Sequence, residues 1–341
     1  MSKKTVVGVD LGGTNVRAGV FDEQGHPIGS AVENPSRAQN GTTAIIESIA
    51  KTVDQAIAAS GESPVAVGMA VPGNIDNVHG TVKWSPNLGE TVNGVFVCWR
   101  DQAVREPLSR HLTLPIQMGN DANLATLGEY KFGTGRGNAR CLVMLTLGTG
   151  IGGGVVMNSS SVFGKADGPL MLLGGNGGGG ELGHMVIMHG GLDCNAGSYG
   201  AIEGYCQRDS IIRRAIHRIQ RGRKSIIAEL VEGDLSKITP RIISMAADQG
   251  DDLAQQIWTE VGTYLGIGIA NAINVFNPDI VAIGGQIAKA GEWLLGPARR
   301  AAGDAAIPSL FADATIVAAE QIDNAGMMGG AAMALESLKW N

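Results

Sequence analysis

The chain has 341 residues, of which 44% are hydrophobic and 17% are charged, and its formal net charge is −6 at pH 7. This length allows two domains with substantial cores, and the composition is that of a globular protein, which excludes an intrinsically disordered chain. The negative charge argues against a nucleic-acid-binding surface, which needs clustered positive charge. No apolar run reaches the ~18 residues of a membrane span, and no signal-peptide pattern follows Met1, so we expect a cytoplasmic protein.

Cysteine and glycine usage narrows the class of protein further. The four cysteines, at positions 98, 141, 194 and 206, are few and scattered. This spacing predicts reduced cysteines, mostly in the core, and not a disulfide framework. Glycine occurs 51 times without a regular period. We expect it where the backbone turns sharply or approaches another group closely.

The first predicted element is a buried strand at residues 5–9, a short apolar run rich in β-branched residues. It leads into Asp10-Leu11-Gly12-Gly13-Thr14-Asn15, and a second strand follows at residues 16–21. This order predicts a β-hairpin, whereas a P-loop would pass into a helix and carry Gly-Lys-Ser/Thr. The turn is either a plain hairpin turn or a phosphate loop. In a phosphate loop, the glycine amides would reach phosphate oxygens and Asp10 would hold Mg²⁺ through water.

The next elements are a helix and a strand. Residues 42–59 carry isoleucine and valine at four-residue steps, which predicts an amphipathic helix that ends at Gly61. A strand at residues 65–71 stops at Pro72 and Gly73. Residues 74–93 are rich in turn formers and are predicted to be a loop, in which Asn87 either binds a hydroxyl group or lies on an ordinary surface. Residues 101–111 are predicted to be helical.

A strand at residues 115–119 runs into Asn120-Asp121-Ala122-Asn123, and a helix follows as far as residue 132. Asp121 is therefore expected at or near a helix N-terminus. An aspartate in this position is either an N-cap or a carboxylate base at the mouth of a cleft. The residues alone leave both interpretations open.

A second strand–glycine–strand unit follows. Residues 139–147 are an apolar strand that ends in Gly148-Thr149-Gly150, and a returning strand begins at residue 155. Two such units are more specific than one, and they predict two related domains that each present a phosphate hairpin to a shared cleft. The same stretch then supplies two acids, a histidine and a cysteine: Glu181, His184, Cys194 and Glu203.

The remaining elements are mostly helical. Helices are predicted at residues 201–221, 239–249 and 253–276, and the last ends at Asn277-Pro278. A buried strand at residues 279–283 opens into Gly284-Gly285, where a nucleotide base can pass over bare backbone. A helix at 293–302, a strand at 314–319 and a closing helix at 325–338 complete the chain. Alternating strands and helices predict the α/β class.

These motifs resemble those of ROK-family sugar kinases, within the actin, Hsp70 and hexokinase superfamily, and the chain is most similar in type to bacterial glucokinases. Six stretches carry the resemblance in the family's order: residues 10–14, 119–123, 147–154, 180–184, 277–285 and 324–332. The resemblance implies an α/β, two-domain actin-like ATPase (ribonuclease H-like) fold with an interdomain cleft that closes on sugar. The expected domains are residues 1–119 plus 325–341, and residues 120–324.

The implied activity is that of an ATP-dependent hexose kinase that transfers the γ-phosphate to the 6-hydroxyl of glucose, with ATP and Mg²⁺ as cofactors and a homodimer or homotetramer as the assembly. N-acetylglucosamine, N-acetylmannosamine and fructose stay open as acceptors, because the same acids would bind several sugars. A second class is a non-catalytic sugar sensor, since the family includes repressors. We expect no DNA-binding domain, because the first phosphate strand begins at Thr5. A chaperone or filament relative is disfavoured by Glu181 and Glu203.

The resemblance also assigns roles to residues. Asp121 is the expected catalytic base, which takes a proton from the acceptor hydroxyl as phosphoryl transfer requires. The residues expected to bind the sugar are Asn120, Asp121, Glu181, His184 and Glu203, with Gly73 and Asn87 as helpers. The residues expected to bind the nucleotide are Asp10, Gly12, Gly13, Thr14, Gly148, Thr149, Gly150, Gly284 and Gly285.

The sequence departs from the family pattern in two places. The family usually binds zinc through the motif histidine and the cysteines of Cys-x-Cys-Gly-x-x-Gly-Cys, but here the second and third cysteines are Ala196 and Ala201. His184 and Cys194 alone cannot complete a tetrahedral site, so we predict no structural zinc and assign no metal ligand. Secondly, residues 159–169 form an insertion, which is either a tolerated surface loop or part of a lid.

Overall fold

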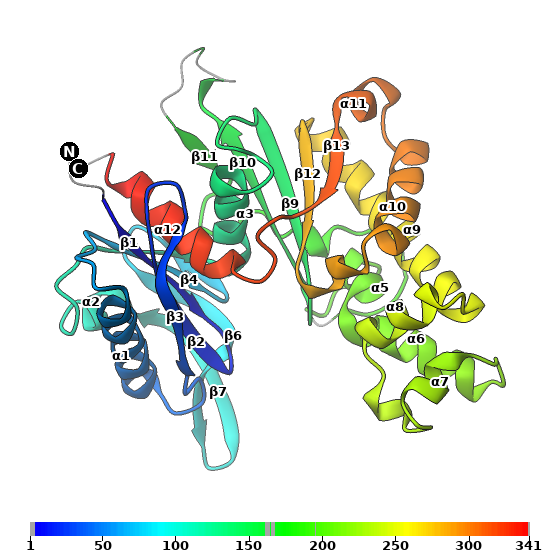
Figure 1. Ribbon diagram of the computed structural model, residues 1–341, viewed down its shortest axis with the longest axis horizontal. Helices are drawn as coiled ribbons and strands as arrows, with labels where there is room; N and C mark the ends of the chain where they lie inside the picture. Colours follow the sequence, from blue (N-terminus) through cyan, green and yellow to red (C-terminus); the bar gives the residue numbers. More distant parts are fainter. Residues whose placement is uncertain (1–3, 161–163, 165–167, 195, 340–341) are drawn as a thin grey trace. The chain divides into compact units, whose positions relative to one another are not determined.

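The computed structural model describes residues 4–160, 164, 168–194 and 196–339 (Figure 1). The chain divides into two compact units. Unit 1 consists of the described residues of 1–139, 154–180 and 324–341, and unit 2 of those of 140–153 and 181–323. By this division, residues 120–139 and 154–180 pack with unit 1. The predicted domain ranges are 1–119 plus 325–341 and 120–324. They place residues 120–139 and 154–180 in the second domain instead, and they stay a prediction.

Unit 1 is built on a five-stranded sheet in the order β3-β2-β1-β4-β8. Its strands are β1 (Val6–Leu11), β2 (Asn15–Phe21), β3 (Pro27–Pro35), β4 (Val67–Val71) and β8 (Ile116–Asn120). The first three strands pair antiparallel, whereas β4 pairs in parallel with both β1 and β8. β4 is buried along its whole length, and β1 nearly so. Continuous apolar runs of this kind are typical of strands that are covered on both faces.

The helices of unit 1 cover this sheet. Helix α1 (Thr42–Ser60) buries its isoleucine stripe in the core, and it ends at Gly61 in the left-handed conformation with φ of 68°, as predicted. Helix α12 (Ala325–Ser337) contributes Met327, Met328 and Leu335 to a second core cluster with Val6 of β1. The expectation that the last helix returns to the first part of the chain is confirmed.

Glycines let α12 approach its neighbours with bare backbone. A Cβ at Gly68 of β4 would lie 1.9 Å from the Gly330 carbonyl oxygen, and one at Gly128 would lie 2.7 Å from the Gly329 nitrogen. Gly128 belongs to helix α3 (Asp121–Phe132), which lies beside α12 in Figure 1. The sheet, α3 and α12 therefore form one tightly packed body that fixes the end of β8 and the start of α3.

Residues 74–103 differ from the prediction. The expected loop and the first part of the expected helix are a three-stranded antiparallel sheet of β5 (Asn74–Asp76), β6 (Thr81–Val92) and β7 (Val95–Ala103). Only the short helix α2 (Arg105–Leu108) remains helical. The β6–β7 turn is Asn93-Gly94, with φ of 51° and 78°. Asn-Gly is the strongest short hairpin signal, but the turn formers in β6, where the register shifts between Ser85 and Gly89, concealed it.

The second sheet has the order β11-β10-β9-β12-β13. Its strands are β9 (Cys141–Leu147), β10 (Ile151–Asn158), β11 (Pro169–Met171), β12 (Ile280–Gly284) and β13 (Thr315–Ala318). Strand β12 pairs in parallel with β9 and β13. The division between the units falls within β10, after Gly153. Strand β10 begins at Ile151, directly after the glycine turn, and not at residue 155 as predicted.

Unit 2 is otherwise helical. Its helices are η1 (Leu182–His184), α5 (Ile202–Cys206), α6 (Arg208–Gln220), α7 (Ile226–Leu230), η2 (Leu235–Lys237), α8 (Pro240–Asp248), α9 (Asp252–Phe276), η3 (Gln286–Ala290), α10 (Glu292–Ala305) and α11 (Pro308–Asp313). The helix predicted at 201–221 is two helices, because Gln207 adopts an extended conformation. Within α9, a Cβ at Gly266 would lie 2.4 Å from the Ala298 carbonyl oxygen of α10. This close approach of two helices is one of the uses that we expect of glycine in this chain.

Two further expectations concern the insertion and membrane spans. Most of the predicted insertion at residues 159–169 falls on residues 161–163 and 165–167, which lie outside the described residues. At its described edges, the Ser159 N–H donates to the Gly168 carbonyl oxygen at 3.1 Å. Within the described ranges, no helix combines the length and the apolar character that a membrane crossing needs.

Candidate functional site

Asp121, the predicted base, is the first residue of α3 and is partly buried. The helix is capped by Asn120, whose side-chain oxygen accepts from the Asn123 N–H at 3.0 Å. The N-cap interpretation of Asp121 is therefore wrong, because its neighbour fills that position. One Asp121 oxygen accepts from the Ala122 N–H at 2.8 Å, which orients the carboxylate at the positive end of the helix dipole.

Asn120 also ties the start of α3 to the end of β4. Its side-chain NH₂ donates to the Gly73 carbonyl oxygen at 2.9 Å. Gly73 has φ of 111°, and a Cβ there would lie 2.2 Å from the Trp84 carbonyl oxygen of β6. Glycine is required at this position by both the conformation and the contact. The predicted helper Gly73 and the predicted sugar ligand Asn120 are thus brought together.

The first glycine hairpin forms as predicted, between β1 and β2. The Gly12 N–H donates to the Asn15 carbonyl oxygen at 2.8 Å, and Gly13 and Thr14 are exposed at the turn. A Cβ at Gly13 would lie 3.7 Å from the Asn87 Cβ. Asn87, on β6, therefore lies beside this turn. The structure brings a predicted phosphate loop and a predicted sugar helper next to each other within unit 1.

Asp10 lies at the end of β1, where its carboxylate packs against the first turn of α12. A Cβ at Gly326 would lie 2.3 Å from the Asp10 Cγ, so only glycine leaves room for the carboxylate. Burial raises the pKa of Asp10, and the Arg17 guanidinium opposes this shift. Arg17 lies opposite Asp10 on β2 and donates to the Asn324 side chain at 3.1 Å. Sequence reasoning assigned no role to Asn324 or Gly326, although both lie in one of the motifs.

The second glycine hairpin belongs to unit 2 and is held by Glu203. The Gly148 N–H donates to the Gly150 carbonyl oxygen at 2.9 Å, which closes the turn around exposed Thr149. Glu203 is only 6% exposed, and its Oε2 accepts from the Ile151 N–H at 2.9 Å. A Cβ at Gly150 would lie 2.7 Å from the same oxygen. A predicted sugar ligand and a predicted phosphate loop are therefore in direct contact.

His184 lies between two other predicted residues. It is partly buried on η1, and its Nε2 lies 3.9 Å from Glu181 Oε2, whereas its Nδ1 lies 3.9 Å from Cys194 Sγ. Glu181 itself is exposed. In the described part of the chain, the one group of three side chains close enough to share a metal ion is His184, Cys194 and Glu203, whose ligand atoms lie within 4.8 Å of one another.

These three side chains do not make a closed zinc site. Glu203 Oε2 is hydrogen-bonded to Ile151, and Cys194 Sγ lies 3.0 Å from Ser198 Oγ, so both groups have protein partners. A closed tetrahedral site needs four ligands. The positions that would supply the others hold the methyl groups of Ala196, which is exposed, and Ala201, which is fully buried. The donor set does not fit structural zinc.

Gly284 and Gly285 are packed against protein on the side where a side chain would stand, and Gly285 remains partly exposed. Gly285 has φ of 79°, and a Cβ there would lie 2.2 Å from the Leu147 carbonyl oxygen at the end of β9. A Cβ at Gly284 would lie 2.3 Å from the Met144 methyl group. These glycines join β12 closely to β9, and the chain then enters η3 at Gln286.

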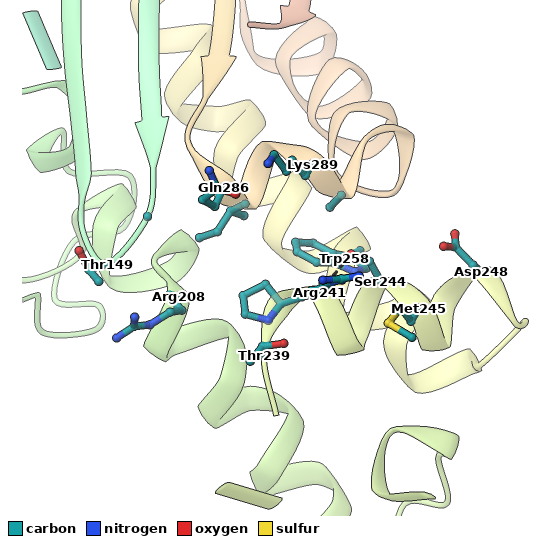
Figure 2. Close-up of a pocket in the computed structure, with 14 residues that line it drawn as sticks. Thr149, Arg208, Thr239, Arg241, Ser244, Met245, Asp248, Trp258, Gln286 and Lys289 are labelled. Atoms are coloured by element: carbon teal, nitrogen blue, oxygen red, sulfur yellow. Dashed lines mark hydrogen bonds between the residues drawn. The ribbon is translucent and has the colours of Figure 1, made fainter. Parts of the chain in front are cut away.

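A pocket of about 800 Å³ opens beside the second hairpin, entirely within unit 2 (Figure 2). It is lined by Gly148, Thr149, Arg208, Thr239, Pro240, Arg241, Ser244, Met245, Asp248, Trp258, Gln286, Ile287, Lys289 and Ala290. The lining comes from the hairpin, the start of α6, the whole length of α8, the first part of α9, and η3. The hairpin is fixed to this wall, because the Arg208 N–H donates to the Gly148 carbonyl oxygen at 2.9 Å.

The pocket combines an apolar floor with polar groups of mostly positive charge. Three cationic side chains, Arg208, Arg241 and Lys289, line the pocket. The one acid among the described lining residues is Asp248, and Figure 2 shows all four side chains. Trp258 is fully buried, and its indole Nε1 has no hydrogen-bond partner within the described residues. A large pocket with a few polar groups is the usual form of a small-molecule site. The excess of cations in the lining favours an anionic ligand, and it is partly offset because Arg208 pairs with Asp209 at 2.9 Å and Lys289 with Asp323 at 2.5 Å.

Sequence reasoning missed most of these lining residues. The N-cap Thr239 and Pro240 at the first position of α8 are readable signals of a helix start. They do not reveal that the helix faces the Gly148 turn. Arg208, Trp258 and Lys289 carry no local signal at all, because they come from separate helices that meet only in the fold.

Comparisons with known proteins place these features in a family. The model of the ROK family matches residues 6–337. The glucokinase of Thermotoga maritima is 35% identical over 338 residues, which cover 99% of both chains. A xylose repressor of Caldicellulosiruptor bescii is 25% identical and aligns with 98% of this chain and 79% of its own length.

A solved structure agrees with the sequence comparisons. A ROK family glucokinase from Streptomyces griseus, in complex with glucose and AMPPNP, matches with a TM-score of 0.78 and 30% identity over 97% of this chain and 99% of its own. The predicted fold class, the α/β actin-like ATPase fold, is confirmed by this likeness.

Proposed function

The chain belongs to the ROK family, and from this premise we propose that it is an ATP-dependent kinase that phosphorylates the 6-hydroxyl of a hexose, with glucose as the expected acceptor. The observation that carries the proposal is the similarity to a glucokinase over nearly the whole of both chains. A repressor with the same domain also matches, but at lower identity and over less of its own length.

We assign the proton transfer to Asp121. Its carboxylate accepts from the Ala122 N–H, and because a carboxylate can accept several hydrogen bonds it can also accept from a sugar hydroxyl. Asn120 is held by Gly73 and Asn123, so it can present a fixed polar group beside this base. These contacts support preorganisation, because neither side chain has to search for its orientation when the sugar binds.

We assign the other sugar contacts to Glu181, His184 and Glu203. Carboxylates accept hydrogen bonds at both oxygens, so Glu203 can hold a sugar hydroxyl while it keeps its bond to Ile151. The proposed consequence is a link between acceptor and nucleotide, because the same carboxylate positions the Gly148–Gly150 turn. Asn87 and Gly73 are assigned as helpers in unit 1.

We assign the nucleotide to the pocket beside the second hairpin. Its volume of about 800 Å³ suits a nucleoside, and its cationic rim suits phosphates. The Gly148, Thr149 and Gly150 amides, and those of Gly12, Gly13 and Thr14 in the first hairpin, are the proposed phosphate contacts. We assign Gly284 and Gly285 to this site because they let β12 pack closely on β9, and these two strands support the pocket.

Asp10 is the proposed carboxylate for Mg²⁺. An oxygen ligand fits this hard cation, and the contact with Gly326 fixes the carboxylate at the first hairpin. A bound Mg²⁺ would neutralise phosphate charge during transfer. Burial raises the pKa of Asp10 and the Arg17 guanidinium opposes this shift, so a further cation nearby would favour the charged carboxylate.

The test is an assay of ADP release from the full-length protein, with glucose, N-acetylglucosamine, N-acetylmannosamine and fructose offered separately. We expect glucose to stimulate ATP turnover most. We expect Asp121→Asn to lower kcat by about 10²- to 10⁴-fold, because the amide cannot accept the proton. If no sugar stimulates turnover, the kinase proposal fails, and sugar binding measured by calorimetry would then identify a sensor.

A matched control comes from the same helix turn. Asn123→Ala removes a neighbouring side chain that is 4% exposed and not assigned to catalysis but keeps the backbone N–H that bonds to Asn120, so it tests whether any disturbance of this turn stops turnover. Full activity in Asp121→Asn would contradict the assignment of the base. Preference for another of the four sugars would leave the kinase in place and correct its acceptor.

A further inference from the structure

The chain between η1 and α5 has almost no regular structure, yet it carries His184 at one end and Glu203 just beyond the other. We define the clamp segment as the described residues 185–194 and 196–201. Its backbone is closed by two isolated bridges, Val186 with Ala201 and Asp193 with Tyr199. The Ile202 N–H also donates to the Met185 carbonyl oxygen at 3.1 Å, so the two ends of the segment meet next to His184.

The Tyr205 hydroxyl holds the middle of the clamp segment. Tyr205 lies on α5 and is only 3% exposed. Its hydroxyl oxygen accepts from the Leu192 N–H at 2.9 Å, and its hydrogen is directed at Met188 Sδ, 3.5 Å away. A Cβ at Gly191 would lie 2.0 Å from this hydroxyl, so the backbone there has closed directly onto it.

The tyrosine is itself fixed from behind. Its ring packs on Tyr264 with centroids 4.4 Å apart, and its carbonyl oxygen accepts from the Arg214 guanidinium at 3.4 Å. The far end of the segment is closed locally, because Cys194 and Ser198 are joined by a backbone hydrogen bond of 3.0 Å and by the contact of their side chains. Protein groups therefore hold the loop at its middle, through Tyr205, and near Cys194, through Ser198.

We propose that the clamp segment is held without a metal ion, by the Tyr205 hydroxyl, and that Tyr205 is a positioning residue for His184 and Glu203. The argument joins two independent observations. The donor set of His184, Cys194 and Glu203 lacks a fourth ligand, and a buried hydroxyl supplies the missing cross-link between the segment and α5. The consequence for sugar binding rests on the proposed function, whereas the clamp itself does not.

The first test removes one oxygen atom. In Tyr205→Phe the ring and its packing stay, but the Leu192 N–H loses its acceptor. We expect the amide hydrogens of residues 186–194 to exchange about tenfold faster or more, and the Tm to fall by about 3–8 °C. Tyr264→Phe is the matched control, since it removes a hydroxyl from the stacked partner, and it should leave exchange in the segment unchanged. Equal exchange in Tyr205→Phe and the unchanged protein would overturn the clamp.

A second variant tests the close contact from the other side. Gly191→Ala places a methyl group on the hydroxyl, and Gly191 has no positive φ that would penalise alanine by itself. We expect Gly191→Ala to speed amide hydrogen exchange in the clamp segment. Gly191→Ala should have a smaller effect on exchange in a protein that already carries Tyr205→Phe, because the hydroxyl oxygen is then absent. Additive effects of the two substitutions would show that the contact does not exist and would count against the proposal.

The metal and sugar arms separate this proposal from the kinase assignment. Elemental analysis of the purified protein should find far less than one zinc per chain, and neither a chelator nor added Zn²⁺ should shift the Tm. Stoichiometric zinc whose removal lowers the Tm would overturn the metal-free clamp.

The positioning role is tested by kinetics. Tyr205→Phe should raise KM for the sugar by about tenfold and leave KM for ATP nearly unchanged. An unchanged sugar KM, in a variant with a loosened segment, would overturn the positioning role. Absence of any sugar turnover in the unchanged protein would instead overturn the kinase proposal and leave the exchange result standing.

Discussion

A single carboxylate, Glu203, joins a proposed sugar ligand to a proposed phosphate turn in unit 2. Its Oε2 holds the Ile151 N–H just after the Gly148–Gly150 turn, and the side chain is almost fully buried. A buried carboxylate with a backbone donor is expensive to leave unpaired. The turn and the acid therefore stabilise each other, and a change at either one should disturb both.

The pocket beside that turn gives the prediction at this scale. Ser244 lies on α8 in the pocket wall, and Ser244→Trp would fill much of the space assigned to the nucleoside. We expect KM for ATP to rise by about tenfold or more while KM for the sugar stays nearly constant, because only one of two substrates loses its contacts. Steady-state kinetics with each substrate varied in turn provide the measurement.

The control for this prediction is a tryptophan that does not enter the pocket. Gln249, at the end of the same helix, is exposed and is not part of the lining. Gln249→Trp should leave both KM values unchanged. Equal KM values for ATP in Ser244→Trp and in the unchanged protein would show that the nucleotide binds elsewhere.

Residues differ in how far their roles can be predicted from the sequence. Asp121, Glu181 and the glycine turns lie in contiguous motifs, and the resemblance of those motifs to the ROK family carries the prediction of their roles. Arg208, Trp258 and Lys289 become neighbours only when α6, α9 and η3 pack together, so no local pattern could identify them. The capping by Asn120, and not by Asp121, also depends on a one-residue detail of the helix start.

Elements were predictable where one periodicity dominates. The stripe of α1 and the buried runs of β1 and β4 specify their own structure. The β6–β7 hairpin was missed because Pro86 and Asn87 interrupt the alternation, and the strand accommodates them by a shift in register. Helix α12 was predicted as an element, but its tight fit depends on glycines in other elements.

That fit gives the prediction at the scale of elements. A Cβ at Gly68 would lie 1.9 Å from the Gly330 carbonyl oxygen, which is backbone and cannot rotate away. Gly68→Ala should therefore force β4 and α12 apart and lower the free energy of unfolding by about 3 kcal/mol or more. The measurement is urea unfolding of the full chain, in which hydrogen exchange of the β1 and β4 amides reports the stability of unit 1.

Gly175 is the matched control for this substitution. It also lies in unit 1, has no positive φ, and would have no atom within 4 Å of an added Cβ. Gly175→Ala should leave the free energy of unfolding within about 0.5 kcal/mol of its original value. If Gly68→Ala proves equally neutral, the close backbone contact of α12 with the sheet is wrong.

At the scale of the whole molecule, the two units are assembled from separated stretches of sequence. Unit 1 takes its last helix from the end of the chain, after the chain has built nearly all of unit 2. The strand–glycine–strand repeat predicted two related parts, but the packing of residues 154–180 with unit 1 has no signal in the sequence. Compactness depends on contacts between distant segments, whereas motifs report only local order.

This discontinuity predicts an unequal response to truncation. A chain that stops after Asp323 lacks α12, and with it the burial of Met327, Met328 and Leu335 against Val6 and Phe21. Loss of these three side chains removes about 5–9 kcal/mol of apolar burial, which is comparable to the whole stability of a typical domain. Every residue described in that cluster belongs to unit 1, so the described core of unit 2 keeps its own contacts. In the truncated chain we expect amides of β1 and β4 to exchange freely while those of β9, β12 and α9 stay protected. Protection of β1 and β4 without α12 would show that unit 1 does not depend on its last helix.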